Sequence, residues 1–426
     1  MSISERHRAT VMAVQPMETE LEMVRGDGPY LYTADGRQLL DLATGIAVNA
    51  VGYSHPRVLA AIEGQLKRHL HLYSGTGYQA ALVDYAEALC QELPADYRIF
   101  FGNSGTEAVE AAIKLARFVT GRPGVIAFRG SFHGRTLGAL SLTASAARYR
   151  SGYEPLLPSV YHIDYPAPTR LGLSAELALA HVQTQMERLL ETEVSPDRVA
   201  LMVVEPIQGE GGYVIPPDDF LGWLHRLCRR HGILLAADEV QSGMGRTGRM
   251  FAYQHSMAAP DLVIMGKALG GGLPLSALAA PASLSDLWPE GAHGTTFGGN
   301  ALSCAAGLAT LEVIREEHLT DAAGRLGSAA IQHLAPLLDL PEVLEVRGRG
   351  LMVAVEFQGE RAGQLAHEVV VESLRAGMVL HTAGLRHEVI RLMPPLNIGT
   401  ELWSSALDRL MEVVREVCSP AAVARG

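Results

Sequence analysis

The sequence predicts an α/β fold in which a large domain carries a mainly parallel sheet and a smaller α+β domain follows it. From about residue 55 onward, short apolar runs alternate with stretches of helical periodicity, as strand–helix–strand units do. One run, Val199 to Val204, is apolar at every position, which is typical of a strand buried on both faces of a parallel sheet. The chain has 426 residues, a length at which one hydrophobic core usually gives way to two domains.

Three segments follow from this pattern. Residues 1–55 contain a hairpin signal at Asp35-Gly36 and are expected to pack with the small domain. Residues 56–310 form the predicted large domain, with apolar strands expected at 98–101, 125–128, 199–204, 233–237 and 262–265 and helices around 109–116 and 220–228. Residues 311–426 form the predicted small domain, with a helix at 311–319, strands at 342–346 and 351–355, and a final helix at 402–417.

Composition restricts the classes of function. The formal charge of −11 argues against binding to nucleic acid or to an anionic membrane surface, because both require basic patches. The four cysteines lie far apart and form no Cys-x-x-Cys pair, so neither a zinc site nor a dense disulfide framework is expected, and no metal is predicted. The N-terminal residues lack the apolar core of a signal peptide, and no apolar run approaches about 18 residues, so we expect a cytoplasmic protein.

Unusual residues follow several predicted strands, at the positions where open α/β sheets bind ligands. After the strand at 98–101 comes the segment GNSGTE, residues 102–107, and then a helix. Small residues let backbone N–H groups approach an anion, the helix N-terminus favours negative charge, and Ser104 and Thr106 add hydroxyls. The segment predicts a phosphate site, although an ordinary helix cap with a glutamate in the first turn also explains it.

Asp238 and Lys267 each end a buried apolar run. A carboxylate at the end of a buried strand is costly unless it is paired, and a protonated heterocyclic nitrogen is one such partner. Burial lowers the pKa of an amine, so a lysine in this position can form a Schiff base and move protons. Taken singly, Asp238 is equally well explained as a helix cap or ion-pair partner, and Lys267 as a lysine whose amine reaches the surface.

A further strand end, SFHGRT at residues 131–136, follows the strand at 125–128. In this segment the ring of Phe132 is suited to stack on a planar cofactor, and Arg135 is suited to bind a carboxylate through its fork of donors. The alternative is a packing aromatic residue and a surface arginine.

Six motifs along the chain resemble those of the class III, or subgroup II, PLP-dependent aminotransferases: NSGTEAVEAAIK, SFHGRT, EPIQGEGG, DEVQSGMGRTG, GKALGGGLP and TTFGGN. The resemblance extends from roughly Gly26 to the C-terminal helix. It implies fold type I of the PLP-dependent transferases, pyridoxal 5′-phosphate (PLP) as the cofactor, and transfer of an amino group from a small-molecule donor to an oxo acid. It also implies a homodimer, or a dimer of dimers, with shared active sites.

The resemblance implies a role for each matching residue. Lys267 would be the Schiff-base lysine and Asp238 the partner of the pyridine nitrogen. The rest of the cofactor site would consist of Gly105 and Thr106 at the phosphate, Thr296 reaching the phosphate from the neighbouring subunit, Phe132 and Val240 on the two ring faces, Gln241 near the phenolic oxygen, and Ser104, His133 and Glu205 around them.

Three residues, Glu205, Glu210 and Arg391, match positions that matter in the branch of the family that uses ω-amino acids with 2-oxoglutarate. Arg391 would bind the α-carboxylate of glutamate or 2-oxoglutarate, and Glu210 would pair with Arg391 when the donor lacks an α-carboxylate, because a buried unpaired arginine is costly. Arg135 would hold the distal carboxylate, and Ile46 suits a short chain such as 4-aminobutyrate. A turn carboxylate and an interdomain ion pair are the plainer interpretations of Glu210 and Arg391.

The donor stays open between 4-aminobutyrate, ornithine and N-acetylornithine. The stretch GIAVNAVG at residues 45–52 is similar to the acetylornithine group, whereas EPIQGEGGY and the longer N-terminus are similar to the 4-aminobutyrate group. Tyr53 departs from the family, in which many relatives have histidine. A racemase on the same scaffold and a non-enzymatic PLP-binding module are alternatives; the intact Glu210–Arg391 pair counts against the first, and the intact Lys267 and Asp238 against the second.

Overall fold

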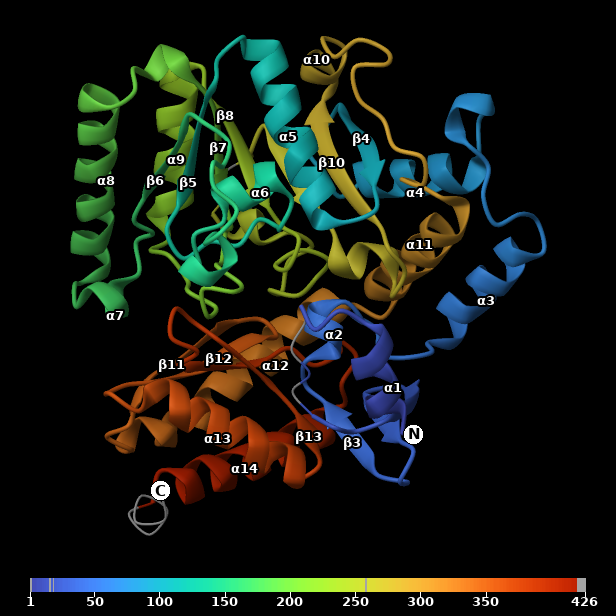
Figure 1. Cartoon of the computed structure of the whole chain (residues 1–426), viewed down its shortest axis with the longest axis vertical. Coiled ribbons are helices and arrows are strands. Elements are labelled where there is room, and N and C mark those ends of the chain that lie inside the picture. Colours follow the sequence, from blue (N-terminus) through green and yellow to red (C-terminus); the bar gives the residue numbers. More distant parts are fainter. Residues whose placement is uncertain (1, 15–16, 18, 257–258, 420–426) are drawn as a thin grey trace.

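The computed structural model describes residues 2–14, 17, 19–256 and 259–419. A seven-stranded sheet with its helices forms the upper half of the molecule in Figure 1, and strands from both ends of the chain share the lower half. No helix in the described part of the chain is long and apolar enough to cross a membrane. All four cysteines are free thiols.

The central sheet confirms the predicted α/β class. Its strand order is β4-β10-β9-β8-β7-β5-β6, and pairing is parallel except where β10 meets β4 and β9. The strands are β4 (Tyr97–Gly102), β5 (Gly124–Phe128), β6 (Val160–Ile163), β7 (Val199–Val204), β8 (Leu234–Asp238), β9 (Leu262–Met265) and β10 (Ser276–Pro281). All five strands predicted for this domain form, whereas β6 and β10 were not predicted.

Helices cover both faces of this sheet because successive strand residues point to opposite sides. In β9, Leu262 and Ile264 belong to the cluster that packs on α5, while Val263 and Met265 belong to the cluster with α4 and α11. The helices of the chain are α1 (Ile3–Thr10), α2 (Thr44–Ala47), α3 (Pro56–Leu66), α4 (Ala80–Cys90), α5 (Gly105–Thr120), α6 (Leu137–Leu142), α7 (Pro168–Leu171), α8 (Ala175–Thr192), α9 (Asp219–His231), α10 (Ala282–Ser285), α11 (Ala301–Glu316), α12 (Leu319–Leu334), α13 (Ala362–Arg375) and α14 (Thr400–Val417).

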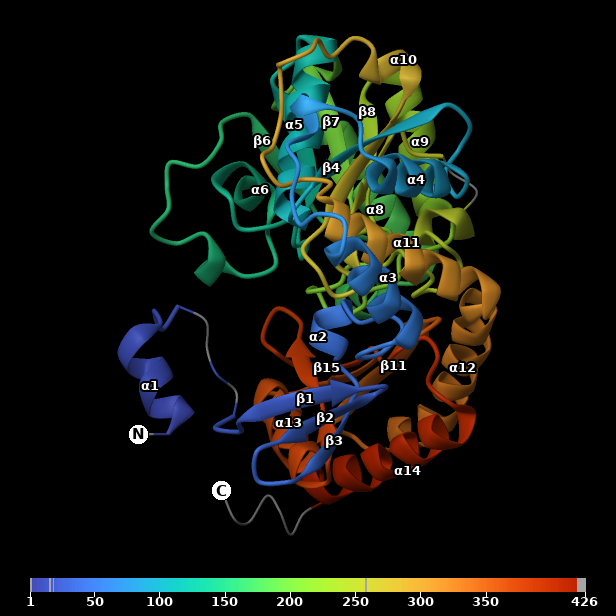
Figure 2. The same cartoon turned by 90° about the vertical axis from the view of Figure 1, so that its right-hand side faces the viewer.

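Two four-stranded sheets make up the lower half. One has the order β1-β2-β3-β13 and joins the N-terminal hairpin to a C-terminal strand, and the other has the order β11-β12-β15-β14. Figure 2 shows the first of them beside α13 and α14. The strands are β1 (Met23–Asp27), β2 (Tyr30–Thr33), β3 (Gln38–Asp41), β11 (Val343–Arg349), β12 (Met352–Phe357), β13 (Met378–Val379), β14 (His381–Ala383) and β15 (Val389–Leu392).

The hairpin turn predicted at Asp35-Gly36 joins β2 to β3, with Gly36 at a φ of 86°. The helix predicted at 311–319 is wrong in extent. Residues 311–316 end α11, and His318, at a φ of 52°, separates them from α12. Neither glycine nor proline marks this break, so the helical pattern of the sequence continues across it and gave no sign of two helices. The domain boundary expected at residue 310 falls inside α11.

A buried arginine docks the two halves of the chain. Arg246 is 2% exposed, and its Nη1 donates to the carbonyl oxygens of Leu351 and Pro394, while its own carbonyl accepts from the N–H of Leu351 at 2.9 Å. Burial lowers the pKa of Arg246 to about 10. Beside this contact, a Cβ on Gly327 of α12 would lie 1.9 Å from the carbonyl oxygen of Gly350. Glycine at position 327 therefore lets α12 pack closely against the backbone of the turn at Gly350, which precedes Leu351.

We expect Gly327→Ala to lower the free energy of unfolding by about 1–3 kcal/mol or more, because the added methyl group overlaps rigid backbone. Gly64→Ala is the matched control, since Gly64 is also helical and a Cβ added there would meet nothing within 4 Å. That variant should be neutral or stabilised by up to about 1 kcal/mol. Thermal and denaturant unfolding midpoints measure both, and equal midpoints for the two variants would contradict the importance of this close packing.

Candidate active site

The residues predicted from strand ends converge at one edge of the central sheet. Asp238 is the last residue of β8, Lys267 follows β9 by two positions, and the helix α5 begins three residues after β4. Strands β8 and β9 are parallel neighbours, with Asp238 opposite Ile264. Phe132 and His133 follow β5 in the same way. The carboxyl ends of parallel strands therefore bring these side chains together, as open α/β sheets do.

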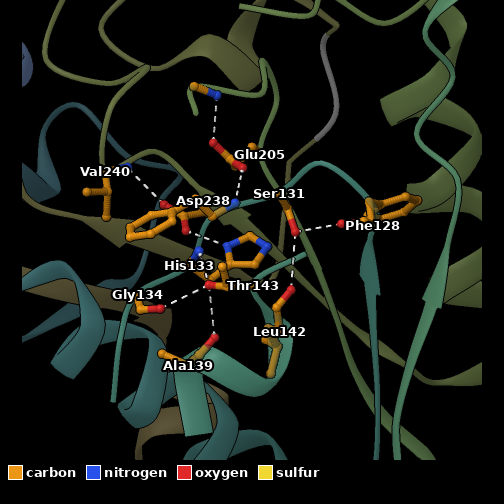
Figure 3. A network of polar contacts seen from close by, with 12 residues as sticks. Phe128, Ser131, His133, Gly134, Ala139, Leu142, Thr143, Glu205, Asp238 and Val240 are labelled. Atoms are coloured by element: carbon orange, nitrogen blue, oxygen red, sulfur yellow. Dashed lines mark hydrogen bonds and ion pairs between the residues drawn. The ribbon is translucent and has the colours of Figure 1, made fainter. Parts of the chain in front are cut away.

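Asp238 is held in a buried network (Figure 3). The side chain is 5% exposed, its Oδ2 lies 2.7 Å from Nδ1 of His133, and its Oδ1 accepts from the N–H of Val240 at 3.1 Å. The N–H of His133 donates to Oγ1 of Thr143 at 2.9 Å, and that hydroxyl donates to the carbonyl of Gly134 at 3.0 Å. The orientation of the carboxylate is thus set by the imidazole and by backbone.

Glu205 extends this network. Its carboxylate is 6% exposed and accepts from the N–H groups of Phe132 at 2.9 Å and Gly209 at 2.8 Å. Burial raises the pKa of Glu205. Burial by itself lowers the pKa of His133, but the hydrogen bond and charge of Asp238, with the charge of Glu205, outweigh it and raise that pKa. The imidazole is therefore suited to donate its Nδ1 proton to Asp238.

Lys267 has the properties expected of a reactive amine. It is one of only three lysines in the chain, with Lys67 and Lys114. Its backbone lies in the left-handed region at a φ of 49°. Burial, together with the charge of Arg391, lowers the pKa of Lys267 to about 8, so the amine loses its proton much closer to neutral pH than an ordinary lysine does. The small number of lysines in the sequence also points to Lys267, an observation on which the prediction from motifs did not draw.

The start of α5 offers backbone donors. The N–H groups of Gly105 and Thr106 have no acceptor within the described residues, and a Cβ at position 105 would lie 3.0 Å from Val240. The hydroxyl of Thr106 lies 2.6 Å from that of Thr136, which donates to Glu110 at 2.6 Å. The Thr106 hydroxyl must therefore be the donor to Thr136, so its backbone N–H is the group left for an anion.

Glu107 serves as a cap in this structure. Its Oε2 accepts from the N–H of Asn103 at 2.6 Å and from Nδ2 of Asn103 at 2.9 Å. Nδ2 also donates to Oγ1 of Thr295 at 3.1 Å. The neighbouring Thr296 is exposed in the single chain. The alternative explanation of GNSGTE, a helix cap with a glutamate in the first turn, thus holds for Glu107. This cap does not conflict with an anion site at the N–H groups of Gly105 and Thr106.

The aromatic side of the site contains one residue that the motifs did not indicate. The ring of Phe132 meets that of Tyr149 edge to face, with centroids 5.6 Å apart. The guanidinium carbon of Arg135 lies 4.7 Å from the Tyr149 ring centroid and 5.9 Å from that of Phe132. Arg135 is exposed, and no carboxylate among the described residues pairs with it. Tyr149 lies in a loop that belongs to no strand end, so sequence position gave no signal for it.

Glu210 and Arg391 form an ion pair. Oε2 of Glu210 lies 3.0 Å from Nη1 of Arg391, whose side chain is 3% exposed and also donates to the carbonyls of Gly209 and Thr382. Burial opposes both charges, but each partner favours the charged form of the other, which lowers the pKa of Glu210 and raises that of Arg391. Both side chains influence the pKa of Lys267 and so lie near its amine.

Ile46 stands in a strained turn. Thr44, Gly45, Ile46 and Ala47 all have a φ between 47° and 63°, a run of left-handed backbone that non-glycine residues rarely adopt. Ile46 is 41% exposed. The carboxylate of Asp41 accepts from the N–H groups at positions 43 and 44 and from the hydroxyl of Tyr53 at 2.5 Å. The hydrogen bond from Tyr53 to Asp41 thus stabilises the start of the turn that contains Ile46.

The site suits a planar, anionic nitrogen heterocycle such as PLP. Asp238 offers a buried carboxylate for a ring nitrogen, Lys267 an amine of lowered pKa, and the start of α5 unpaired N–H groups for a phosphate. Buried polar atoms without a partner in the described part of the chain include Nε2 of His133 and Oε1 of Gln241. These observations agree with the cofactor that the motifs imply.

A cavity of about 500 Å³ lies elsewhere, among Arg129, Arg150, Arg170, His162 and Leu385. None of the residues predicted for the site lines it. No group of three or more His, Cys, Asp or Glu side chains within the described ranges is arranged to hold a metal ion.

Known proteins resemble this chain over nearly its whole length. The family model described as aminotransferase class-III matches residues 11–414. An acetylornithine aminotransferase from Methanopyrus kandleri is 42% identical over 394 residues, which cover 92% of this chain and 94% of the relative. A 4-aminobutyrate aminotransferase from Mycobacterium tuberculosis is 35% identical over 98% of this chain and 96% of its own. The ornithine aminotransferase from Toxoplasma gondii, whose crystals show partial occupancy of PLP, superposes with a TM-score of 0.85 at 31% identity, covering 97% and 94% of the two chains.

We expect acylation of Lys267 in cofactor-free protein to follow an apparent pKa of about 8. The amine loses its proton as the pH rises, so labelling should increase through about pH 8 and then level off. Arg391→Met should move this transition to higher pH, because the charge of Arg391 lowers the pKa. Mass spectrometry of the labelled peptides measures the rates, with Lys67 and Lys114 as internal references. A transition at the ordinary value of 10.5 would contradict the burial argument.

Proposed function

The chain belongs to the class-III aminotransferases and is a PLP-dependent enzyme, and from this premise we propose that it transfers the amino group of an ω-amino acid, such as 4-aminobutyrate, to 2-oxoglutarate. The observation that supports this substrate pair best is the ion pair between Glu210 and Arg391, at 3.0 Å and close to Lys267. The two substrates differ at the reacting carbon, since that carbon carries a carboxylate in glutamate and 2-oxoglutarate and carries none in 4-aminobutyrate.

The Glu210–Arg391 pair accommodates this difference. With an ω-amino donor in place, Glu210 stays on Arg391 and the buried guanidinium keeps a counter-ion. With glutamate or 2-oxoglutarate in place, the α-carboxylate takes the position of Glu210 on Arg391. Either arrangement leaves no unpaired buried charge, and an unpaired charge would cost about 3–5 kcal/mol. Glu210 is less buried than Arg391, with 27% of its side chain exposed against 3%, so the glutamate is the partner that moves.

The other residues have distinct tasks in this proposal. Arg135, exposed and without an acidic partner in the described structure, binds the carboxylate at the far end of either substrate. Lys267 holds the cofactor and, once its amine is released, moves a proton to and from the reacting carbon, which a pKa of about 8 permits. Tyr53 and Asp41 hold the turn that places Ile46 beside the substrate chain.

PLP, when bound, supplies a carbonyl that condenses with amines and a protonated ring that accepts an electron pair. Asp238 would hold the ring nitrogen, with its carboxylate oriented by His133. Gly105 and Thr106 would hold the phosphate through backbone N–H groups, with Ser104 beside them. Phe132 and Val240 would bound the ring faces. Gln241 would contribute near the phenolic oxygen, since its Oε1 is buried without a partner in the described structure.

We propose further that the working unit is a homodimer in which Thr296 reaches the phosphate of the neighbouring subunit. Thr296 is exposed in the single chain, and its loop is anchored through the contact of Thr295 with Asn103.

N-acetylornithine is the second candidate donor, because the acetylornithine aminotransferase of Methanopyrus kandleri is more similar in sequence to this chain than the 4-aminobutyrate enzyme of Mycobacterium tuberculosis is. Its reacting carbon also lacks an α-carboxylate, so the same Glu210–Arg391 arrangement serves it.

We expect Arg391→Ala to raise the KM for 2-oxoglutarate by about 10- to 100-fold and that for 4-aminobutyrate by much less, because only the first places a carboxylate on Arg391. Glu210→Gln is the reciprocal variant, and it should impair the 4-aminobutyrate half-reaction more than the glutamate half-reaction. Steady-state kinetics and single half-reactions measure both. An equal rise in both KM values would remove the exchange mechanism, and a wild-type enzyme that uses pyruvate but not 2-oxoglutarate would contradict the acceptor.

A further inference from the structure

A second arginine beside Arg135 also lacks an acidic partner. Arg148 belongs to the 3-10 turn Ala147–Tyr149 between α6 and β6. Its guanidinium carbon lies 4.9 Å from the centroid of the Tyr149 ring, the same ring that Arg135 contacts at 4.7 Å. No carboxylate of the described residues forms an ion pair with either arginine. By contrast, Arg129 and Arg170, which flank the nearby cavity, both have acidic partners.

Arg148 is held in place by neutral groups. Its Nη2 donates to the hydroxyl of Tyr149 at 3.1 Å, and its Nη1 is hydrogen-bonded to Nε2 of His387, which lies between β14 and β15. Burial and the charge of Arg148 lower the pKa of His387, which favours the neutral, accepting imidazole. An exposed arginine ordinarily needs no acidic partner. Arg148 differs because a ring, a hydroxyl and an imidazole hold its guanidinium in one position, while none of these groups neutralises its charge.

The two arginines lie on the substrate side of the site. Tyr149 contacts Phe132, the ring expected against the cofactor, and influences the pKa of Arg391. His387 is close enough to Glu210 and Arg391 to be influenced by both. With Glu210 paired to Arg391, the guanidinium charges of Arg135 and Arg148 have no acidic partner among the described residues. A region with two uncompensated guanidiniums attracts a carboxylate and repels an ammonium group.

We propose that Arg148 is a specificity-determining residue, which forms with Arg135 a two-arginine receptor for the distal end of the substrate. This inference rests on the proposed ω-aminotransferase function and names its substrate class: amines whose far end carries a carboxylate and no free ammonium group. 4-Aminobutyrate and N-acetylornithine fit this description, as does the distal carboxylate of 2-oxoglutarate. Ornithine does not fit, because its α-ammonium would lie beside two cations, and a like-charge contact selects against it.

Equilibrium binding of glutarate to the holoenzyme tests the receptor without any turnover. The affinity for PLP, whose proposed contacts include neither arginine, reports on general damage to the site. We expect Arg148→Gln to weaken glutarate binding by about tenfold in calorimetry and to leave the dissociation constant of PLP within twofold. Arg148→Lys should fall between, since it keeps the charge and loses the fork. Arg150→Gln is the matched control, because Arg150 lies two residues away and donates to the carbonyl of Thr143.

Loss of glutarate binding with unchanged PLP affinity in Arg148→Gln would support the receptor. Equal losses of glutarate and PLP affinity, no loss of glutarate binding, or the same loss in Arg150→Gln would overturn it. The donor preference is measured separately, as the ratio of half-reaction kcat/KM values for N-acetylornithine and ornithine. This ratio should fall about tenfold in Arg148→Gln, and an unchanged ratio would refute the selection against ammonium. Failure of the proposed function is distinguishable, because it would show in the wild-type enzyme as absence of 2-oxoglutarate turnover.

Discussion

The contact between the buried carboxylate of Asp238 and the imidazole of His133 is the interaction on which the rest of the site depends. A lone carboxylate at the end of a buried strand is unfavourable, and the 2.7 Å contact with His133, with the Val240 N–H at 3.1 Å, compensates it. The same two contacts orient the carboxylate. The backbone N–H of His133 is in turn held by the hydroxyl of Thr143, so the position of Asp238 follows from the loop after β5 as well as from β8. Two strands of the same sheet therefore define one side of the proposed cofactor site.

The distribution of charge bears on how an acidic chain would recognise the acidic substrates proposed above. The formal charge is −11, so the field of the whole protein opposes anions, and binding must come from local groups. Near Lys267, Arg391 has one acidic partner, and around the ring of Tyr149, Arg135 and Arg148 have none among the described residues. Lys267 responds to Arg391, because the charge of Arg391 adds to burial in lowering the pKa of its amine. In the proposed function, substrate binding and the reactivity of the amine would therefore both depend on Arg391.

The sequence predicted the elements whose signal is local. The apolar runs of β7 and β9 were placed with their bounds, and the family motifs identified the aminotransferase class. The strand β10 was missed because its residues, SALAAP, are small and show no alternation. The contacts of Tyr53 with Asp41 and of Arg148 with His387 join residues distant in sequence, so no periodicity or spacing could indicate them. The residues proposed at the strand ends come together in the structure, whereas their roles rest on the experiments above.

The most direct test of the cofactor site is borohydride reduction of the PLP-loaded enzyme, followed by peptide mass mapping. Because the chain has only three lysines, the result is unambiguous. We predict a phosphopyridoxyl group on Lys267, no label on Lys67 or Lys114, and a weaker cofactor affinity in an Asp238→Asn variant with label still confined to Lys267. Label on either of the other lysines, or a full stoichiometric label in a Lys267→Ala variant, would contradict the assignment of this strand end as the catalytic centre.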